Sequence, residues 1–314
     1  MKIKLLELFG GIGAPRRALL ELGFDVKSID YVEVDEKAVR SYNSMFDNRQ
    51  CTQDVRTWNM QPDILVHGSP CQDISIAGKQ LGADKDSGTR SSLLYETLRI
   101  IRNFGIWKPR VVIWENVRNV ISKYMIHNFN GYLKELEELG YVNSFEVVNA
   151  LDYGLPQNRE RVFVVSVLGK KPFNFDEMEK KRLVNISEFL EQNVDERYIV
   201  TQESMLRMIE GRFKNPKFKR KIDIIGDYCN TITTRQVRCP NSGVIDIGNG
   251  RYRYLTEKEC WRLQGFRDCD YDAALKANPS RKGCMNNTLY RQAGNSMPVT
   301  VLKEIFRVLL KDVI

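Results

Sequence analysis

A cysteine beside a proline is the side chain of this 314-residue chain best placed for nucleophilic chemistry. Cys71 follows Pro70 in the motif Gly-Ser-Pro-Cys-Gln, directly after an apolar run, residues 63–67, that we predict to be a strand. A cysteine attacks as its thiolate, so it acts as a nucleophile where a ligand site favours that form. The alternative is a small buried residue, which is what most single cysteines are. We interpret His67 as a strand-end residue rather than a base.

A carboxyl group and two guanidinium groups are candidates for the same chemistry. Glu115 ends another apolar run within Trp-Glu-Asn-Val, and an acid there would face Cys71 at the carboxyl edge of a sheet. Arg159 and Arg161 belong to Gln-Asn-Arg-Glu-Arg, where alternate positions of an extended segment point the same way. Taken alone, each of these groups is better explained as one half of a surface salt bridge.

A glycine-rich loop follows the first predicted strand. Phe9-Gly10-Gly11-Ile12-Gly13 leads into a helix with Pro15 in its first turn, so backbone N–H groups and a close approach are available to a ligand. Glu33, after the second strand, is placed to accept from ribose hydroxyls. Asp54, at the end of a third short strand, is a candidate for an adenine amino group. The loop lacks the Gly-x-Gly-x-x-Gly pattern, and a plain strand–turn–helix explains it equally well.

The elements that must position these groups alternate between strands and helices, which predicts an α/β fold with an open, largely parallel sheet and helices on both faces. The last two strands have only a turn at residues 153–156 between them, so we expect them to pair antiparallel. The predicted helices cover residues 15–22, 36–46, 91–104 and 126–139. The predicted strands cover residues 3–9, 26–33, 63–67, 110–115, 142–150 and 161–168.

The character of the chain changes after residue 168. Residues 171–290 are charged, weakly periodic and rich in turn signals, which indicates a second, smaller and irregular domain. Residues 297–314 again have the pattern of an amphipathic helix, so we expect a first domain built from residues 1–170 with 291–314. Within the second domain, six of the ten residues 212–221 are basic and two are phenylalanine. That stretch is suited to phosphate contacts, although a solvated charge run is the alternative.

Composition narrows the class of protein. The net charge of +8 favours a polyanionic partner such as nucleic acid, although a solvated basic surface gives the same number. No apolar run approaches the roughly 20 residues that cross a bilayer, and charge interrupts residues 1–7 too early for a signal peptide. Seven cysteines without a Cys-x-x-Cys pair, together with two histidines, predict neither a disulfide framework nor a metal site. We therefore expect a reducing cytoplasm.

Taken in order, the four motifs resemble the signature of the DNA (cytosine-5)-methyltransferase family, as found in bacteria and phages. Residues 73–80 with 90–93 resemble the family's mobile catalytic loop. Residues 253–266 resemble the segment that follows its recognition region, and residues 292–299 resemble its C-terminal motif. The resemblance covers almost the whole chain, with a gap at about residues 170–250. It implies the S-adenosylmethionine-dependent, Rossmann-like methyltransferase fold, with the smaller domain recognising the target.

The resemblance also implies a mechanism. The thiolate of Cys71 adds to carbon 6 of cytosine, and carbon 5 then takes the methyl group of S-adenosylmethionine. Glu115 matches the acid that contacts N3 and the exocyclic amine, while Arg161 matches the residue that holds O2. Arg159 is expected to contact the DNA backbone. Because stacking in a duplex blocks the face of the base, the cytosine must be flipped out.

Further residues are assigned by the same resemblance, and no metal is expected. Two departures are Ala14, where many members have glycine, and Val34, where an aromatic residue often stacks on adenine. The expected DNA contacts are Ser75, Lys79, Arg159, Thr231 from a short threonine motif, and Arg235. The expected cofactor-binding residues are Phe9, Gly11, Ile12, Gly13, Glu33, Asp54, Pro70, Leu93, Asn295 and Ser296.

We expect a monomer that acts on double-stranded DNA in a bacterial cytoplasm or from a phage genome, and a separate restriction endonuclease is a compatible partner. Two alternatives were weighed. A transfer-RNA cytosine-5 methyltransferase branch typically carries Cys-Phe-Thr after the last strand, and that tripeptide does not occur in this chain. A catalytically inactive DNA-binding relative usually lacks the cysteine or the acid, whereas Cys71 and Glu115 are both present.

Overall fold

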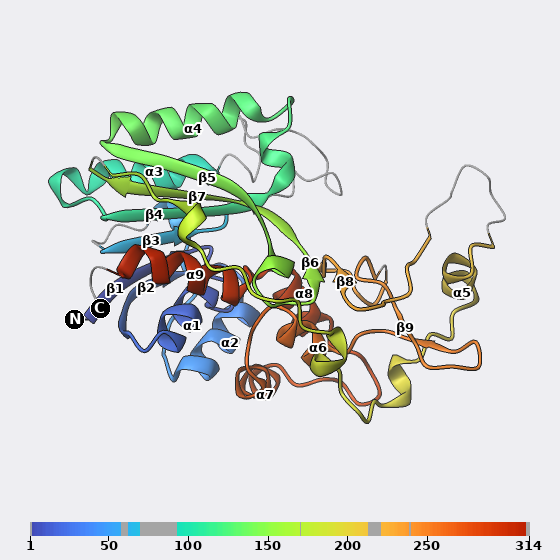
Figure 1. Cartoon of the computed structure of the whole chain (residues 1–314). Helices are drawn as coiled ribbons and strands as arrows, with labels where there is room; N and C mark the ends of the chain where they lie inside the picture. The colour runs from blue at the N-terminus through green and yellow to red at the C-terminus, as the bar shows by residue number, and fades with distance from the viewer. Residues whose placement is uncertain are drawn as a thin grey trace.

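The computed structural model describes residues 2–57, 62–69, 93–169, 171–212, 221–238 and 240–311 (Figure 1). Four residues expected at the site lie outside the described residues, and so does most of the basic stretch at 212–221. The four are Pro70, Cys71, Ser75 and Lys79.

A six-stranded sheet forms the centre of the described chain. Its order is β2-β1-β3-β4-β7-β5. The first four of these strands run parallel, whereas β7 pairs antiparallel with β4 on one side and with β5 on the other. The largely parallel sheet is confirmed, and so is the antiparallel pairing of the last two strands. The bounds are β1 Lys2–Leu8, β2 Asp25–Val32, β3 Ile64–His67, β4 Val111–Val117, β5 Tyr141–Asn149 and β7 Glu160–Leu168.

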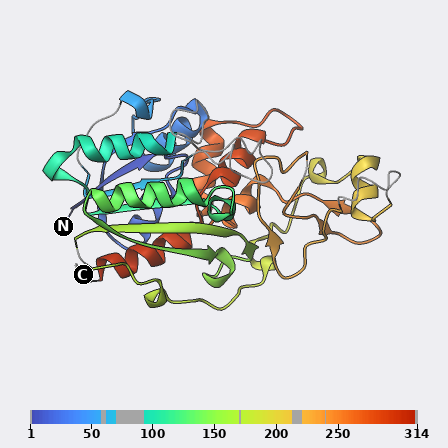
Figure 2. The same cartoon turned by 90° about the horizontal axis from the view of Figure 1, so that it is seen from above.

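Helices cover both faces of this sheet (Figures 1 and 2). One face packs against α1 (Ala14–Glu21) and α9 (Val299–Leu310), with α2 (Glu36–Phe46) beside them. The opposite face packs against α3 (Leu94–Asn103) and α4 (Ile126–Glu138). Each central strand is apolar on both sides, as parallel strands between two helical layers are.

The short strand β3 illustrates how the two cores meet. Ile64 and Val66 point into the core beneath α1 and α9, while Leu65 points into the core beneath α3 and α4. All four residues of β3 are buried, including His67 at its end. A run buried on both faces is continuous rather than alternating in sequence, which is why residues 63–67 were recognisable as a strand.

The C-terminal segment returns to the first half of the chain, as expected. The helix α9 packs against α1 and buries Val301, Leu302, Ile305 and Phe306. Figure 1 shows the two termini at the same end of the sheet. The sheet is therefore enclosed only when residues from both ends of the chain are present.

One predicted element is wrong. No strand lies between the end of α2 at Phe46 and Asp54, and Val55–Thr57 form a 3₁₀ turn instead. The polar sequence Cys51–Asp54 has no apolar face to bury, so it runs as a loop from α2 towards β3.

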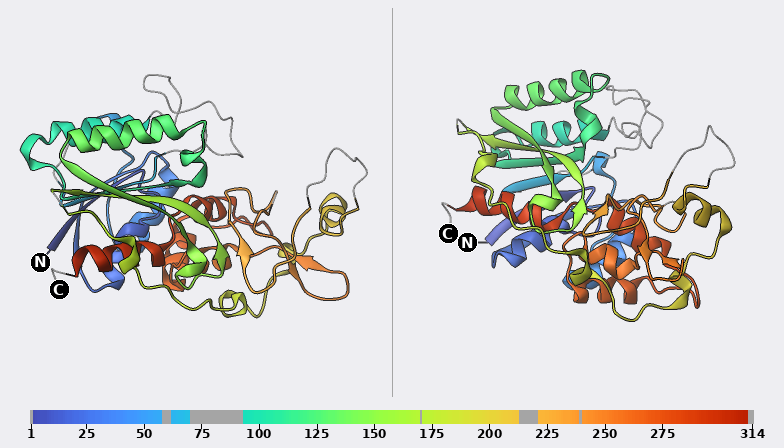
Figure 3. Two further views of the ribbon diagram at one scale, coloured as in Figure 1. Left: turned by 45° about the horizontal axis from the view of Figure 1, so that its top comes forward. Right: turned by 45° about the vertical axis from the view of Figure 1, so that its right-hand side comes forward.

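The region after residue 170 is less irregular than the sequence indicates. Its outer part, with α5 and β9, extends away from the sheet (Figure 3). By contrast, α6, α7 and α8 pack near α2, and Trp261 belongs to the same hydrophobic core as α1 and α9. The division into residues 1–170 with 291–314 and residues 171–290 stays a prediction. The elements are β6 Gln157–Asn158, α5 Glu203–Ile209, β8 Cys229–Asn230, β9 Ile245–Asp246, β10 Tyr252–Arg253, α6 Glu257–Arg262, α7 Asp268–Ala277 and α8 Asn287–Asn295.

Buried acids explain why sequence periodicity misses α6 and α7. Glu259 in α6 is fully buried and accepts two hydrogen bonds from the guanidinium of Arg253. Asp270 in α7 is buried against Arg17 of α1. A carboxylate on the inner face interrupts the apolar pattern by which an amphipathic helix is recognised.

The Arg17–Asp270 ion pair gives a prediction about stability. Arg17→Met should lower the free energy of unfolding by about 3–5 kcal/mol, because it removes the guanidinium that contacts the buried Asp270 carboxylate and leaves only the more distant charge of Arg267, at 3.8 Å, among the described residues. Urea unfolding followed by circular dichroism measures the change. In Arg17→Met/Asp270→Asn the charge is removed as well, so part of the loss should be recovered. A single-variant loss below ~1 kcal/mol would show that water reaches Asp270.

Candidate active site

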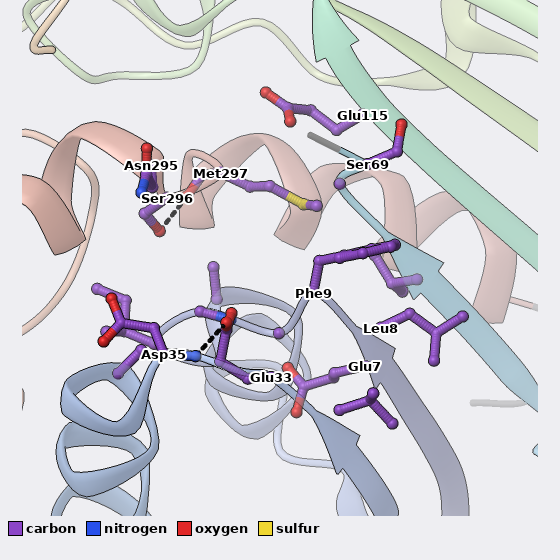
Figure 4. Close-up of a pocket in the computed structure, with 18 of the residues that line it drawn as sticks. Glu7, Leu8, Phe9, Glu33, Asp35, Ser69, Glu115, Asn295, Ser296 and Met297 are labelled. Atoms are coloured by element: carbon purple, nitrogen blue, oxygen red, sulfur yellow. Dashed lines mark hydrogen bonds between the residues drawn. The ribbon is translucent and has the colours of Figure 1, made fainter. Parts of the chain in front are cut away.

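A cavity of about 730 Å³ lies at the carboxyl ends of the parallel strands. Figure 4 shows Glu115 and Ser69 on one side of it, Glu33 and Asp35 on the other, and Met297 between them. Ligands bind at this edge of open α/β sheets. The predicted site residues that line the cavity are Phe9, Gly11, Ile12, Glu33, Asp54, Leu93, Glu115, Arg159, Arg161, Asn295 and Ser296.

The glycine-rich loop forms the floor between β1 and α1. Gly11 and Gly13 have positive φ angles of 53° and 74°, and Phe9 also has a positive φ of 54°. A Cβ on Gly13 would lie 2.6 Å from the rings of Tyr42 and Phe46, so only glycine lets α1 begin this close to α2. Gly13 is absent from the cavity lining and shapes the site indirectly.

Glu33 fastens this loop to the end of β2. Its Oε2 accepts a hydrogen bond from the Gly11 amide at 3.0 Å. Its Oε1 accepts from the amides of Val34 and Asp35 at 2.8 and 2.9 Å. Burial raises the pKa of Glu33, whereas these three backbone donors lower it. The carboxylate therefore holds the loop in place as well as facing the cavity.

Charged pairs line the rim of the cavity near Glu33. Arg56 donates from Nε to Asp54 at 2.9 Å and holds the pKa of that carboxyl at about 2. Arg291 of α8 lies 2.5 Å from Asp35, the N-cap residue of α2. Val34 is 68% exposed on this rim, so it offers a small apolar surface.

A buried acid and an arginine occupy the other end of the cavity. Glu115 of β4 is 9% exposed, and its Oε1 lies 3.1 Å from Nε of Arg161 on the neighbouring strand β7. Burial raises the pKa of Glu115, while the charges of Arg161 and then Arg159 lower it. Burial and the two arginine charges thus act on the pKa of this carboxyl in opposite directions, and the effect of burial is the larger.

The chain leading to Pro70 and Cys71 is fastened beside Glu115. Ser69, the last described residue before them, accepts a hydrogen bond at Oγ from Nε1 of Trp114 at 3.0 Å. Nδ2 of Asn116 donates to both the carbonyl and the hydroxyl oxygen of Ser69 at 3.3 and 3.2 Å. The Trp-Glu-Asn motif therefore does two jobs, because its outer residues anchor residue 69 while Glu115 faces the cavity.

His67 is not a base in this structure, as the sequence indicated. It is fully buried, and Nε2 lies 2.8 Å from the hydroxyl of Tyr132. Burial lowers the pKa of His67 to about 3, so the imidazole is neutral across the physiological range.

The surroundings of Arg159 differ from those of a surface residue. The sequence predicts a contact with the DNA backbone, but the residue is 2% exposed. Its guanidinium donates to the carbonyl oxygens of Ile232, Gly294 and Ser296 at 3.1, 3.1 and 2.8 Å. The guanidinium is therefore held by backbone carbonyls in this structure, and its contact with the DNA backbone stays a prediction.

Thr231 and Arg235 lie outside the cavity but next to its wall. Thr231 donates to the carbonyl of Asn158 at 2.8 Å, where β8 pairs with β6. Arg235 is exposed on the turn that follows. A Cβ on Gly294 would lie 2.5 Å from the carbonyl carbon of Thr233, so this turn packs directly against the end of α8.

Several residues that line the cavity were missed by the sequence analysis. Met297, Asp35 and Arg291 line the cavity. Glu7 does so too, fully buried beneath the loop, where it accepts from the Tyr42 hydroxyl at 2.7 Å and burial raises its pKa to about 7. For Glu7, the signal in the sequence was an acid placed two residues before the glycine-rich loop that begins at Phe9. Among the described residues, no cluster of His, Cys, Asp and Glu could hold a metal ion, and no helix is long and apolar enough to cross a membrane.

Comparisons with known proteins extend over the whole described chain. Residues 3–311 match the sequence model of the family described as C-5 cytosine-specific DNA methylase. The type II methyltransferase M2.ScrFI of Lactococcus lactis subsp. cremoris is 37% identical over 258 residues, which cover 80% of this chain and 67% of the relative. M1.ScrFI of the same organism is 31% identical over 99% of this chain and 78% of its own length. The orphan methyltransferase M.SPBetaI of Bacillus phage SPbeta is 25% identical, with 98% of both chains covered.

Solved structures agree on the fold. The Entamoeba histolytica methyltransferase EhMeth superimposes with a TM-score of 0.78 at 19% identity, covering 100% of this chain and 99% of the other. The S. pombe Dnmt2 methyltransferase gives 0.77 at 18% identity, with the same coverage. These similarities confirm the Rossmann-like methyltransferase fold.

The Glu115–Arg161 pair gives a prediction about protonation. Arg161→Met should raise the pKa of Glu115 further above its usual 4.5, because the charge that most strongly opposes desolvation is gone. A carboxyl whose folded pKa is raised adds stability below its unfolded pKa, and that stability is lost as pH rises through the folded pKa. The variant should therefore lose stability at neutral pH relative to acid pH.

An NMR titration of the ¹³C-labelled Glu115 carboxyl measures this pKa. Arg102→Met is the matched control, since it removes the same charge from an exposed pair with Glu135 on the helices α3 and α4. If the pKa of Glu115 were unchanged or lower in Arg161→Met, the charge of Arg161 would not be what lowers that pKa in the wild type.

Proposed function

This chain belongs to the C-5 cytosine-specific DNA methylase family, and we propose that it methylates carbon 5 of a flipped-out cytosine through a covalent bond between Cys71 and carbon 6. It is a DNA (cytosine-5)-methyltransferase, and the finer steps are our proposal. The observation that carries them is the buried Glu115–Arg161 pair beside the anchored residue that precedes Pro70 and Cys71.

The cavity fits S-adenosylmethionine, which supplies the electrophilic methyl group when bound. Its volume of about 730 Å³ lies within the usual range for small-molecule sites. Glu33 offers carboxylate oxygens for ribose hydroxyls near the N-terminal end of α1, and Asp54 offers an acceptor on the same part of the rim. We propose that the loop of Phe9, Gly11 and Ile12 holds the cofactor on one side. Leu93, Asn295 and Ser296 also line the cavity and would contact the cofactor. We propose that Pro70 binds the cofactor as well.

The other end of the cavity suits a cytosine. Burial raises the pKa of Glu115, so its protonated form, which can donate to N3 of the base, is easier to reach than that of an exposed carboxyl. Arg161 supplies a fixed positive charge that suits O2. As the Cys71 thiolate bonds to carbon 6, electron density moves to carbon 5, which takes up the methyl group. Loss of the carbon-5 proton and elimination of the thiolate then restore the aromatic ring.

Burial of these two groups supports base flipping. The side chains of Arg161 and Glu115 are only 13% and 11% exposed, so a base stacked in a duplex cannot reach them. A nucleotide turned out of the helix can enter such a pocket. We propose that Ser75 and Lys79 contact phosphates of the DNA backbone.

The turn containing Arg235 is a candidate for target recognition, and we call residues 231–238 the recognition segment. Arg235 is exposed beside the wall of the cavity, and arginine reads guanine edges well. We propose that Thr231 helps to place this segment on DNA, and that residues 171–290 form the recognition domain beside a catalytic domain of residues 1–170 with 291–314.

The setting is proposed from the relatives, which are type II methyltransferases of bacteria and orphan methyltransferases of phages. We propose a monomer that acts on double-stranded DNA in a bacterial or phage-infected cytoplasm. A restriction endonuclease of the same system would act separately. Methylation of cytosine in transfer RNA is the second candidate function, and transfer RNA is the substrate to test if DNA is not methylated.

The nucleophile is tested by Cys71→Ala. When the wild type is expressed in a host without cytosine methylation, it should produce 5-methylcytosine at one short motif. The methylation rate of the variant should be lower by more than ~10³-fold. Bisulfite sequencing of the host genome measures both. Affinity for S-adenosylhomocysteine should stay within a few-fold of the wild type. If Cys71→Ala still methylated DNA, Cys71 would be excluded as the nucleophile.

The covalent step is tested with a duplex that contains 5-fluorocytosine. Fluorine cannot leave as the proton does, so the adduct on the enzyme should persist and migrate as a larger species on a denaturing gel. Cys51→Ala and Cys269→Ala, which change exposed cysteines, are matched controls and should form the adduct normally. An adduct in Cys71→Ala, or none in the wild type, would contradict the mechanism.

A further inference from the structure

One guanidinium joins three segments that are far apart in the sequence. Arg159 lies between β6 and β7, its Nη1 donates to Ile232, and its Nη2 donates to Gly294 and Ser296. All three acceptors are backbone carbonyl oxygens within 3.1 Å. The planar fork of arginine can serve several acceptors in fixed directions, which the single ammonium of lysine does less well.

The three segments carry different parts of the reaction. Ile232 lies in the recognition segment, next to Thr231. Ser296 lines the cofactor cavity. On the other side, the chain continues from Arg159 directly into β7, where Arg161 pairs with Glu115. The guanidinium thus lies where recognition, cofactor binding and the catalytic acid meet.

The neighbouring contacts allow little freedom at this junction. The Gly294 backbone touches the recognition segment so closely that a Cβ would lie 2.5 Å from Thr233. Gln157, two residues before Arg159, accepts from the Ile232 amide at 3.0 Å and donates to the Leu263 carbonyl at 2.8 Å. Since Gln157 and Ile232 are fully buried, a shift of any one segment must move the others.

Arg159 also contributes charge. After Arg161, it is the second positive charge that acts on Glu115. Replacing it by a neutral side chain of similar length would leave three buried carbonyls without their charged donor, and unsatisfied buried acceptors are costly.

We propose that Arg159 is a positioning residue, which holds the recognition segment and residues 294–296 in fixed register with Glu115 and Arg161. This inference rests on the proposed function and deepens it. Arg159 acts through backbone carbonyls rather than by touching the base or a phosphate. Small displacements of reacting groups are costly, so its loss should act on the rate at saturation.

Three variants test this role: Arg159→Met, Arg159→Lys and the exposed control Arg102→Met. With saturating DNA and cofactor, Arg159→Met should lower the single-turnover methylation rate by on the order of 100-fold. It should also weaken S-adenosylhomocysteine binding several-fold in calorimetry, because residues 294–296 lose their anchor. The salt dependence of DNA binding should stay at the wild-type slope. Arg159→Lys should recover part of the rate, and Arg102→Met should behave as wild type.

Two outcomes would overturn the proposal. A wild-type rate at saturating DNA, with weaker DNA binding and a salt slope reduced by about one, would show a phosphate contact. A lower melting temperature with wild-type rate and S-adenosylhomocysteine affinity would show a role in stability alone. Failure of the proposed function is distinguishable, because it would leave the wild type without methylated DNA. The difference in S-adenosylhomocysteine affinity between Arg159→Met and Arg102→Met would still test the positioning of residues 294–296. If Arg159→Met does not fold, Arg159→Lys provides the same comparisons.

Discussion

A buried carboxyl group is the constraint around which this molecule is arranged. Burial of Glu115 disfavours its charge, and among the described residues the guanidinium groups of Arg161 and Arg159 oppose that effect. Such a balance requires fixed geometry, because charges in a space with little water interact strongly over small distances. The pairing of β4 with β7 supplies that geometry, since it places Arg161 diagonally across from Glu115 on neighbouring strands.

The two hydrophobic cores make this pairing rigid. In β4, Val112 and Trp114 pack beneath α3 and α4, whereas Ile113 packs on the side of α1 and α9. A strand enclosed on both faces can move only if both cores are disturbed. In β4 the polar residues are therefore confined to its carboxyl end, where Glu115 and Asn116 lie. The carboxyl ends of the four parallel strands form one edge of the sheet, and the cavity lies at that edge.

Sequence predicts the parts of this arrangement that are encoded in side-chain type. Continuous apolar runs locate β3 and β4, and the order of the motifs brings Glu115 and Arg161 to one site. The role of Arg159 is different, because its partners are backbone carbonyls, which every residue possesses. No pattern of side chains could show that Ile232 and Ser296 would supply them. The helix α7 was missed for a related reason, since Asp270 resembles a surface residue until Arg17 is placed beside it.

The return of α9 to α1 has a consequence for biosynthesis. Domains fold as units during translation, N-terminal parts first, but here one face of the sheet receives Leu302, Ile305 and Phe306 only after nearly all of the described chain has been made. The cavity-lining residues Asn295 and Ser296 are translated just before them. A chain truncated before residue 299 would therefore lack the residues that cover this face of the sheet, and its exposed apolar surface would make it prone to aggregation.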